Sequence, residues 1–226
     1  MSRLSIKKIK ESSELFIGTL MVIWLFVAAI LADLTEDVIN TEAVVGCDNY
    51  WNAVFLNLRT VLGVKIFSII TLLGSWQVIF LISLIIIGLL FYYKKFRSFI
   101  ISFIFTLLSA EIVTFIGKVL IHRYRPENGI MTLSDFSFPS GHSTVAVTFY
   151  GFLAYLAVCQ TKNLKKRWLI ASLAAIIILL IGFSRLYLGV HFVSDILAGY
   201  LVGFLGLVAG ISLREWLVAR KRSHID

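Results

Sequence analysis

Long apolar runs, separated by shorter polar segments, dominate the amino-acid sequence. Six of these runs can cross a hydrocarbon core of about 30 Å as helices, allowing for tilt and for ends that reach the headgroups. They cover residues 16–31, 76–93, 99–120, approximately 142–159, 168–183 and approximately 192–213. This pattern predicts an all-α integral membrane protein built as a six-transmembrane-helix bundle.

The segment between the first two runs, residues 33–75, has a different pattern. Acidic residues dominate its first part, and apolar residues then recur mostly at helical spacing: Trp51, Phe55, Leu56, Leu58, Val61 and Leu62. This arrangement is typical of amphipathic helices that lie along a membrane surface, and we expect one or two of them. Residues 66–73 are too short to cross alone and are expected to be interfacial or re-entrant. With no linker or repeat, residues 1–226 are expected to form a single domain.

The composition excludes a soluble globular domain. Of the 226 residues, 59% are hydrophobic and 15% are charged, and the mean hydropathy is +0.91. Soluble domains carry about 25% charged residues. Intrinsic disorder is excluded by the same numbers, because disordered chains combine low hydrophobicity with high net charge.

Basic residues gather in four clusters, which set the expected orientation. The clusters hold 15 of the 21 lysines and arginines: Arg3, Lys7, Lys8 and Lys10; Lys94, Lys95 and Arg97; Lys162, Lys165, Lys166 and Arg167; Arg214, Arg220, Lys221 and Arg222. Six alternating helices place all four clusters on one side, which the positive-inside rule makes cytoplasmic, together with both termini. Topology and contact with anionic headgroups thus explain the net charge of +8, and no nucleic-acid partner is expected.

The remaining basic residues fall on the outer side, where the orientation rule does not favour them. They are Arg59, Lys65, Lys118, Arg123, Arg125 and Arg185. Charges that break the trend at membrane depth are candidates for function. Four of them lie at or beside predicted helix ends, in three short blocks that cover residues 118–126, 139–142 and 184–195. The blocks also contain both prolines and three of the four histidines.

The three blocks contain the groups that bind a phosphate. Guanidinium groups offer forked donors that match phosphate oxygens, and an ammonium adds a point charge. The proline at 139 predicts the first turn of a helix, whose free amides and positive end favour an anion, and a glycine lets the backbone approach closely. We therefore assign phosphate binding to Lys118, Arg125, Ser140, Gly141 and Arg185. No cofactor and no metal are expected, because the carboxylates and histidines lack the spacing of metal ligands.

Two histidines and one carboxylate add the reactive groups. His191 and Asp195 are four residues apart and share a face if the last helix has begun there. Asp195 can hold one ring nitrogen and leave the other free, which makes His191 an oriented nucleophile. His142 begins a helix beside the phosphate and can protonate the leaving group as general acid. The set predicts two-step phosphoryl transfer through a phosphohistidine.

The blocks Kx6RP, PSGH and SRx5Hx3D resemble, in sequence and in order, the three signature motifs of the type 2 phosphatidic acid phosphatase family. All eleven motif positions are present. That family shares its catalytic core with vanadium haloperoxidases and glucose-6-phosphatase, and the six-helix layout resembles its bacterial lipid-phosphate phosphatases. The resemblance implies His191 as nucleophile, Asp195 as its partner and His142 as general acid. It also implies phosphate binding by Lys118, Arg125, Ser140, Gly141 and Arg185.

Other polar residues near the blocks are interpreted as ordinary. We expect His122 and Arg123 to be solvated or to contact lipid headgroups. Asp135 is expected to cap a helix or to pair with an arginine rather than to take part in catalysis. Glu111, about two helical turns before Lys118, either pairs inside the bundle or lies near a substrate entrance, and the sequence favours neither.

These observations predict a membrane phosphatase in the cell membrane, with its active site on the periplasmic or extracellular side. A site at headgroup depth can take a lipid laterally, so the expected substrate is phosphatidic acid, phosphatidylglycerol phosphate or undecaprenyl diphosphate; a lipid A phosphate is also open. One alternative is a phosphatase of a soluble phosphomonoester. Another is a non-catalytic protein that binds or transports a lipid phosphate, although such a protein needs the cations but not His142, His191 and Asp195. The pattern predicts no particular oligomeric state.

Overall fold

The chain forms a bundle of long helices in a computed structural model that describes residues 3–92, 97–131 and 133–223. Eight helices occur in these ranges, without a strand: α1 (Arg3–Asn40), α2 (Glu42–Asn57), α3 (Val61–Leu72), α4 (Trp76–Tyr92), α5 (Arg97–Ile121), α6 (Gly141–Cys159), α7 (Leu164–Tyr187) and α8 (Val193–Ser223). Six helical segments within the described residues are long and apolar enough to cross a membrane. The predicted all-α, six-span architecture is therefore confirmed, and the protein is a multi-pass membrane protein.

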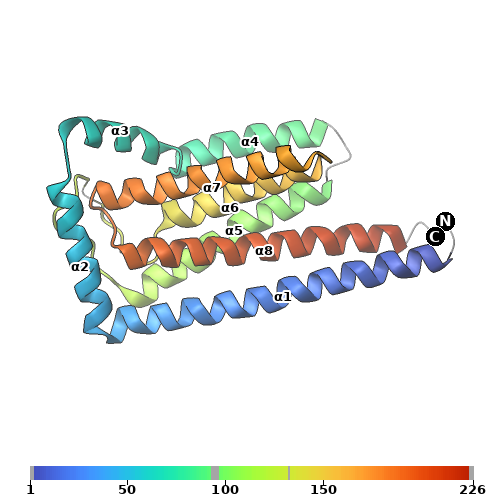
Figure 1. Ribbon diagram of the computed structural model, residues 1–226, viewed down its shortest axis with the longest axis horizontal. Helices are drawn as coiled ribbons and strands as arrows, with labels where there is room; N and C mark the ends of the chain where they lie inside the picture. The colour runs from blue at the N-terminus through green and yellow to red at the C-terminus, as the bar shows by residue number, and fades with distance from the viewer. Residues whose placement is uncertain (1–2, 93–96, 132, 224–226) are drawn as a thin grey trace.

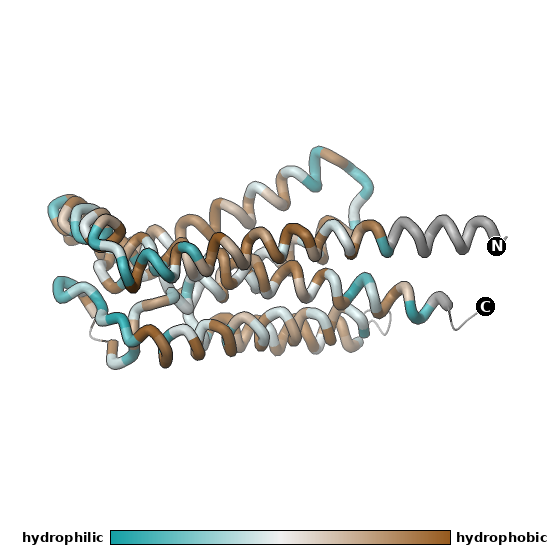
Figure 2. Tube along the Cα trace, turned by 90° about the horizontal axis from the view of Figure 1, so that it is seen from below, coloured by the Kyte–Doolittle hydropathy of each residue, from teal (hydrophilic) through white to brown (hydrophobic). Residues whose placement is uncertain are grey.

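The long helices lie side by side, and α2 lies across one end of the bundle (Figure 1). Helix α1 begins and α8 ends at the opposite end. Apolar residues follow the length of the helices, whereas hydrophilic residues concentrate toward the two ends (Figure 2). This distribution is that of a bundle whose middle faces hydrocarbon and whose ends face water. The transverse α2 matches the amphipathic surface helix expected from residues 33–75.

Several element boundaries differ from the sequence-based expectation, among them the end of α8, which continues to Ser223 instead of ending near residue 213. Helix α1 continues to Asn40 instead of ending near residue 31, because Leu31, Leu34 and Val38 pack against Phe138 and Ala198. Residues 66–73 belong to a span of 32 residues, 61–92, in which α3 and α4 are separated by a short turn. They thus continue into the helix that follows instead of forming a separate piece. Tyr93, Lys94 and Lys95, which the sequence analysis assigned to a span end and a basic cluster, lie outside the described residues.

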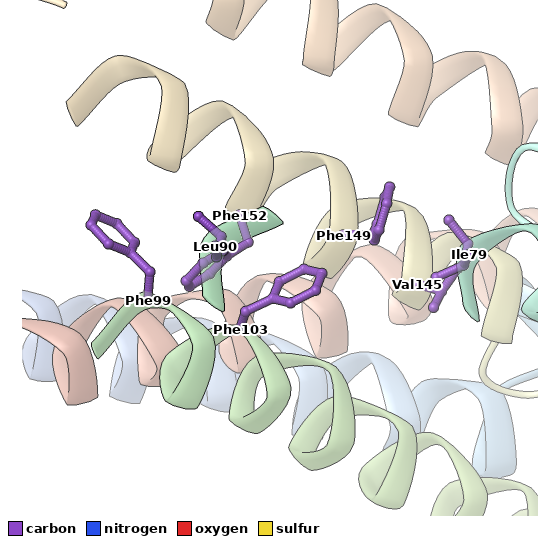
Figure 3. Close-up of a cluster of buried hydrophobic side chains, with 7 residues drawn as sticks. All are labelled: Ile79, Leu90, Phe99, Phe103, Val145, Phe149 and Phe152. Carbon is purple, nitrogen blue, oxygen red and sulfur yellow. The ribbon is translucent and has the colours of Figure 1, made fainter. Parts of the chain in front are cut away.

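A cluster of buried apolar side chains joins α4, α5 and α6. It consists of Ile79, Leu90, Phe99, Phe103, Val145, Phe149 and Phe152 (Figure 3). The ring centroid of Phe103 lies 5.4 Å from that of Phe152 and 5.9 Å from that of Phe149. In a bilayer, the lipid tails are as apolar as these side chains, so the association depends on close packing rather than on the exclusion of water.

Helix α8 approaches its neighbours through glycines at positions 199, 203, 206 and 210. A Cβ atom at Gly199 would lie 2.5 Å from the carbonyl oxygen of Ser140, and one at Gly203 would lie 2.7 Å from that of Thr144. The hydroxyl of Thr144 also donates to the carbonyl of Gly199, at 3.2 Å. Small residues and interhelical hydrogen bonds of this kind hold membrane helices at close distance. They fix the first turn of α6 against the first turns of α8, where the three sequence blocks meet.

Candidate active site

The three blocks converge at the end of the bundle that α2 crosses. Residues 118–126 end α5 and begin the following loop, residues 139–142 begin α6, and residues 184–195 join α7 to α8. Hydrogen bonds connect them in space. Arg125 Nη1 donates to the carbonyl of Val190 at 2.7 Å, and the amide of Ser140 donates to the carbonyl of Asp195 at 3.0 Å. The convergence that the motif order implies is therefore present.

The start of α6 is a capped helix terminus. Ser140 is the N-cap residue, and its hydroxyl oxygen accepts from the amide of Ser143 at 3.5 Å and from the hydroxyl of Ser143 at 3.2 Å. Gly141 follows, and a Cβ atom there would meet only Thr114 Cγ2, at an ordinary 3.9 Å. Helix packing therefore does not explain this glycine. The free amides of the first turn and the positive helix end make the position suitable for an anion.

Asp135 bridges two of the predicted phosphate-binding cations. Its carboxylate accepts from Lys118 Nζ at 2.8 Å and from Arg125 Nη2 at 2.6 Å. The expected pairing of Asp135 with an arginine is confirmed, and Lys118 joins it. Burial alone raises the pKa of Asp135, but the hydrogen bond from Lys118 and the charges of Lys118 and Arg125 outweigh burial and hold this pKa at about 2. The carboxylate is thus ionised at any physiological pH.

Arg185 lies in the last turn of α7 with only 2% of its surface exposed. Its Nη1 donates to the hydroxyl of Thr71 in α3, at 2.8 Å, and its Nε has no hydrogen-bond partner in the described part of the chain. A buried, charged donor without a partner is costly, so this guanidinium is placed to receive an acceptor. The turn after α3 also borders His142, because a Cβ atom at Gly74 would lie 3.3 Å from Cδ2 of that ring.

The two ring nitrogens of His191 face different partners. Nε2 lies 2.9 Å from Arg125 Nη1, and Nδ1 lies 3.3 Å from Asp195 Oδ2. Because a guanidinium can only donate, Nε2 accepts, and the ring proton is then on Nδ1, facing the carboxylate. His191 lies in the turn before α8, yet the four-residue spacing still brings it onto Asp195. Burial and the charges of Arg125, Arg185 and Lys118 hold the pKa of His191 well below its usual value, so the ring is neutral.

Arg123 is bound inside the protein, so its predicted solvated or headgroup-contacting role is wrong. Its side chain is 13% exposed. Nη1 donates to Asp195 Oδ1 at 2.7 Å and to the hydroxyl of Ser194 at 2.6 Å, and Nη2 donates to Asp48 Oδ2 at 2.7 Å. The neighbouring His122 is exposed, as expected. Its positive φ of 50° ends α5 and turns the chain so that Arg123 points back toward α8.

Sequence reasoning missed two further residues of this region, Asp48 and Thr71. Asp48 is buried although it lies in an amphipathic helix, three residues before Trp51 and seven before Phe55. A carboxylate on the apolar stripe of a helix is a signal that could have identified it. Thr71 lies in an apolar run, and nothing in the sequence distinguishes it. Glu111 is exposed on the surface of α5, which does not support a pairing inside the bundle.

Comparisons with known proteins agree with this geometry. Residues 99–218, more than half of the chain, match the model of the PAP2 superfamily. The phosphatidylglycerophosphatase B of Bacillus subtilis (strain 168) is 34% identical over 172 residues, which cover 74% of this chain and 83% of the relative. An undecaprenyl-diphosphatase of Sulfolobus acidocaldarius is 28% identical over 123 residues, covering 51% of this chain and 55% of the relative.

A solved structure shows the same architecture. The crystal structure of a transmembrane PAP2 type phosphatidylglycerolphosphate phosphatase from Bacillus subtilis matches with a TM-score of 0.72 at 30% identity, covering 86% of this chain and 94% of the other. The family model matches all three blocks of the site. The likeness to the Bacillus subtilis relative and to the solved structure covers more of the chain than the family model does. The chain therefore belongs to the PAP2 superfamily, the family whose signature motifs its three blocks resemble.

Proposed function

We propose that this protein removes a phosphate group from a membrane lipid phosphate or diphosphate, without a metal ion and through a phosphohistidine. The observation that carries the proposal is the geometry of His191. Its Nδ1 faces the carboxylate of Asp195 while its Nε2 faces the guanidinium of Arg125, a group that binds phosphate oxygens well. Relatives that are named lipid phosphatases support the reaction class.

The phosphate group is held by cations and by the start of α6. Lys118, Arg125 and Arg185 carry the positive charge, and Ser140 and Gly141 provide the helix terminus. Together they stabilise the charge on the equatorial oxygens as the bonds to phosphorus change. These cations supply what a metal ion supplies in other phosphatases. Within the described residues, no group of three or more histidines, cysteines and acidic residues could hold a metal ion.

The first step forms a bond between His191 Nε2 and phosphorus and breaks the bond between phosphorus and the leaving oxygen. His142 donates a proton to that oxygen, which leaves as the lipid alcohol or, from a diphosphate, as the lipid monophosphate. Asp195 stabilises the positive charge that the ring of His191 acquires. In the second step, water gives a proton to His142 and attacks phosphorus, the bond to Nε2 breaks, and inorganic phosphate leaves.

The site's position at one end of the bundle supports a lipid substrate. A headgroup can reach the site laterally while its tails stay in the bilayer. We place phosphatidylglycerol phosphate first, because a relative of that named activity matches most of the chain, and phosphatidic acid and undecaprenyl diphosphate after it. The described residues of the basic clusters lie toward the end opposite the site, and by the positive-inside rule this supports a site outside the cytoplasm with both termini inside. Because Asp48 and Thr71 contact the site, we treat residues 1–226 as one phosphatase unit.

The test is phosphate release by the purified protein in detergent with EDTA. The panel contains the three lipids and a soluble phosphomonoester, with the variants His191→Ala and His122→Asn. His122 is the matched control, because it is an exposed histidine whose positive φ an asparagine tolerates. We expect release by wild type and His122→Asn but not by His191→Ala, and a base-stable, acid-labile label from a ³²P-labelled lipid on His191.

Each other outcome has a defined meaning. Loss of activity in EDTA overturns the metal-independent mechanism. Release from the soluble ester alone favours a phosphatase of soluble substrates. A folded protein that releases phosphate from no member of the panel favours either an untested headgroup, such as a lipid A phosphate, or a non-catalytic binding or transport protein.

A further inference from the structure

We infer that Asp48 and Arg123 are positioning residues that hold the catalytic carboxylate Asp195 against His191. This inference rests on the proposed function, because it assumes that His191 is the nucleophile. Neither residue belongs to a motif position, and Asp48 lies outside the matched residues 99–218. The transverse helix α2 is then a functional part of the active site rather than only a membrane anchor.

The first part of the argument is that both oxygens of Asp195 are assigned to partners. Oδ1 accepts from Arg123 Nη1 at 2.7 Å. Oδ2 accepts from the amide of Phe192 at 2.9 Å and faces Nδ1 of His191 at 3.3 Å. With Oδ1 bound by a guanidinium, the carboxylate cannot rotate without breaking a charge-assisted hydrogen bond. Arg123, together with the amide of Phe192, therefore fixes which oxygen meets the imidazole.

The second part is that Arg123 is itself held in place. Its Nη2 donates to Asp48 Oδ2 at 2.7 Å, and its guanidinium lies over the ring of Phe192, 4.4 Å from the centroid. Asp48 also accepts from the amide of Ser194 through Oδ1, at 3.0 Å, and from the hydroxyl of Ser194 through Oδ2. A carboxylate from α2 thus binds both the arginine and the first turn of α8.

The third part is burial and charge. The side chains of Asp48 and Asp195 are 3% and 0% exposed, with Arg123 between them. Removing one partner of such a buried pair leaves the other charge unpaired, which is far more costly than losing a surface ion pair. A chain of charged contacts therefore runs from Asp48 through Arg123 and Asp195 to His191. The partners behind a metal-ligating histidine orient its ring, and their loss typically reduces activity about 10- to 100-fold. We expect a loss of the same order for the histidine here.

The experiment compares Asp48→Asn, Arg123→Gln and the double variant with wild type on the best lipid substrate. Glu42→Gln is the matched control, because Glu42 is an exposed carboxylate on the same helix. We expect each single variant to lower kcat about 10- to 100-fold. Both KM and the inhibition constant of inorganic phosphate should stay within about twofold, because the phosphate-binding cations are untouched. Glu42→Gln should equal wild type.

The double variant tests whether Asp48 acts through Arg123. If it does, Asp48→Asn has no further effect once Arg123 is gone, and the double variant retains the kcat of Arg123→Gln within about threefold. If Asp48 only caps α8, the two losses multiply, and the assigned connection is wrong. Unchanged kcat in both single variants, or a KM that rises in parallel with the loss, also overturns the inference.

A further variant covers a failure of Asp48→Asn to fold, measured as thermal unfolding in detergent. Arg123→Lys keeps the charge but cannot reach both carboxylates. Its kcat should lie between those of wild type and Arg123→Gln, with KM unchanged. A wild-type protein without phosphatase activity overturns the proposed function itself. An active wild type whose variants match it overturns only the positioning role.

Discussion

Asp135 contacts the same two cations that the proposed mechanism assigns to phosphate. Its carboxylate accepts from Lys118 and Arg125, and the proposed mechanism needs both cations to bind an anionic substrate. The substrate's phosphate therefore has to replace the carboxylate as their partner. Because its pKa is about 2, Asp135 remains charged over the range in which the enzyme is assayed.

We expect Asp135→Asn to lower KM and the inhibition constant of inorganic phosphate about three- to tenfold, because a competing anion is removed. The effect should be the same from pH 5 to pH 9, since Asp135 does not titrate there. Steady-state kinetics beside Glu127→Gln, an exposed carboxylate in the same loop, provide the comparison. A rise in KM would show instead that Asp135 holds the two cations in position.

His191 gives the pH dependence a definite sign. Burial and three nearby cations lower its pKa, and only the neutral ring can attack phosphorus. Activity should thus fall as the pH decreases through this lowered pKa. We expect the acidic limb of kcat/KM below pH 6.5, the usual histidine value being about 6.5. A pH–rate profile of kcat/KM checks this prediction, and ³¹P NMR measures the ionisation of the substrate itself. An acidic limb above pH 6.5 that the ionisation of the substrate does not explain would contradict the prediction.

The sequence predicted local contacts and helix starts within the site, because nearby residues encode them. His191 and Asp195 are four residues apart, and the helix start at Gly141 follows directly from its flanking residues. Arg123 shows the limit. Its partners Asp195 and Asp48 are 72 and 75 residues away along the chain, so only the packing of α2 and α8 shows that it is bound. An arginine beside the end of a membrane helix looks the same in the sequence whether it is solvated or bound inside the protein.

At the level of elements, the glycines of α8 decide how closely α6 can approach. Gly203 contacts α6 so tightly that an added methyl group would lie 2.7 Å from both the carbonyl oxygen of Thr144 and Cβ of Val147. Neither atom is the end of a flexible side chain, so the helices themselves have to separate. Gly88 in α4 offers the opposite case, because no atom lies within 4 Å of its added Cβ.

We therefore expect Gly203→Ala to destabilise the protein by about 1–3 kcal/mol through overpacking. It should also lower kcat, because the first turn of α6 moves relative to Asp195. Gly88→Ala makes the same chemical change in open space and should leave stability unchanged or slightly raised. Thermal unfolding in detergent compares the two variants. Equal melting temperatures would show that the close packing of α8 against α6 does not determine the stability of the protein.

Element boundaries were predictable where hydropathy alone determines them. The runs that became α4 to α8 were recognised because a bilayer requires long apolar helices. The end of α1 was not, since residues 32–40 are polar and their helical state depends on contacts with Phe138 and Ala198. The break between α3 and α4 was placed correctly, since α4 begins at Trp76. That α3 continues the same span was not predicted, because the turn between them packs against His142 and Ile181, which no local pattern reveals.

At the level of the whole molecule, the site lies at one end of the bundle, and the start of α1 and the end of α8 lie at the other. The proposed orientation then predicts that a reporter enzyme active only outside the cell membrane is inactive when fused after Asp226. The same reporter fused after Asn40, beyond the first span, should be active. Enzyme assays of cells that express both fusions provide the measurement. Activity of the fusion at Asp226 would reverse the orientation and place the site in the cytoplasm.

Helix α2 has two different sides, and this has a consequence for how the enzyme senses its surroundings. Tyr50 is exposed on it, whereas Asp48 is buried against α8. In the proposed orientation, the exposed side of α2 faces the headgroup layer, and its other side carries Asp48 and the charged contacts behind the nucleophile. Lateral tension or a change of lipid composition that shifts α2 would be transmitted to His191. The bilayer then acts as an allosteric effector, and kcat should differ between detergent micelles and lipid nanodiscs even at saturating substrate.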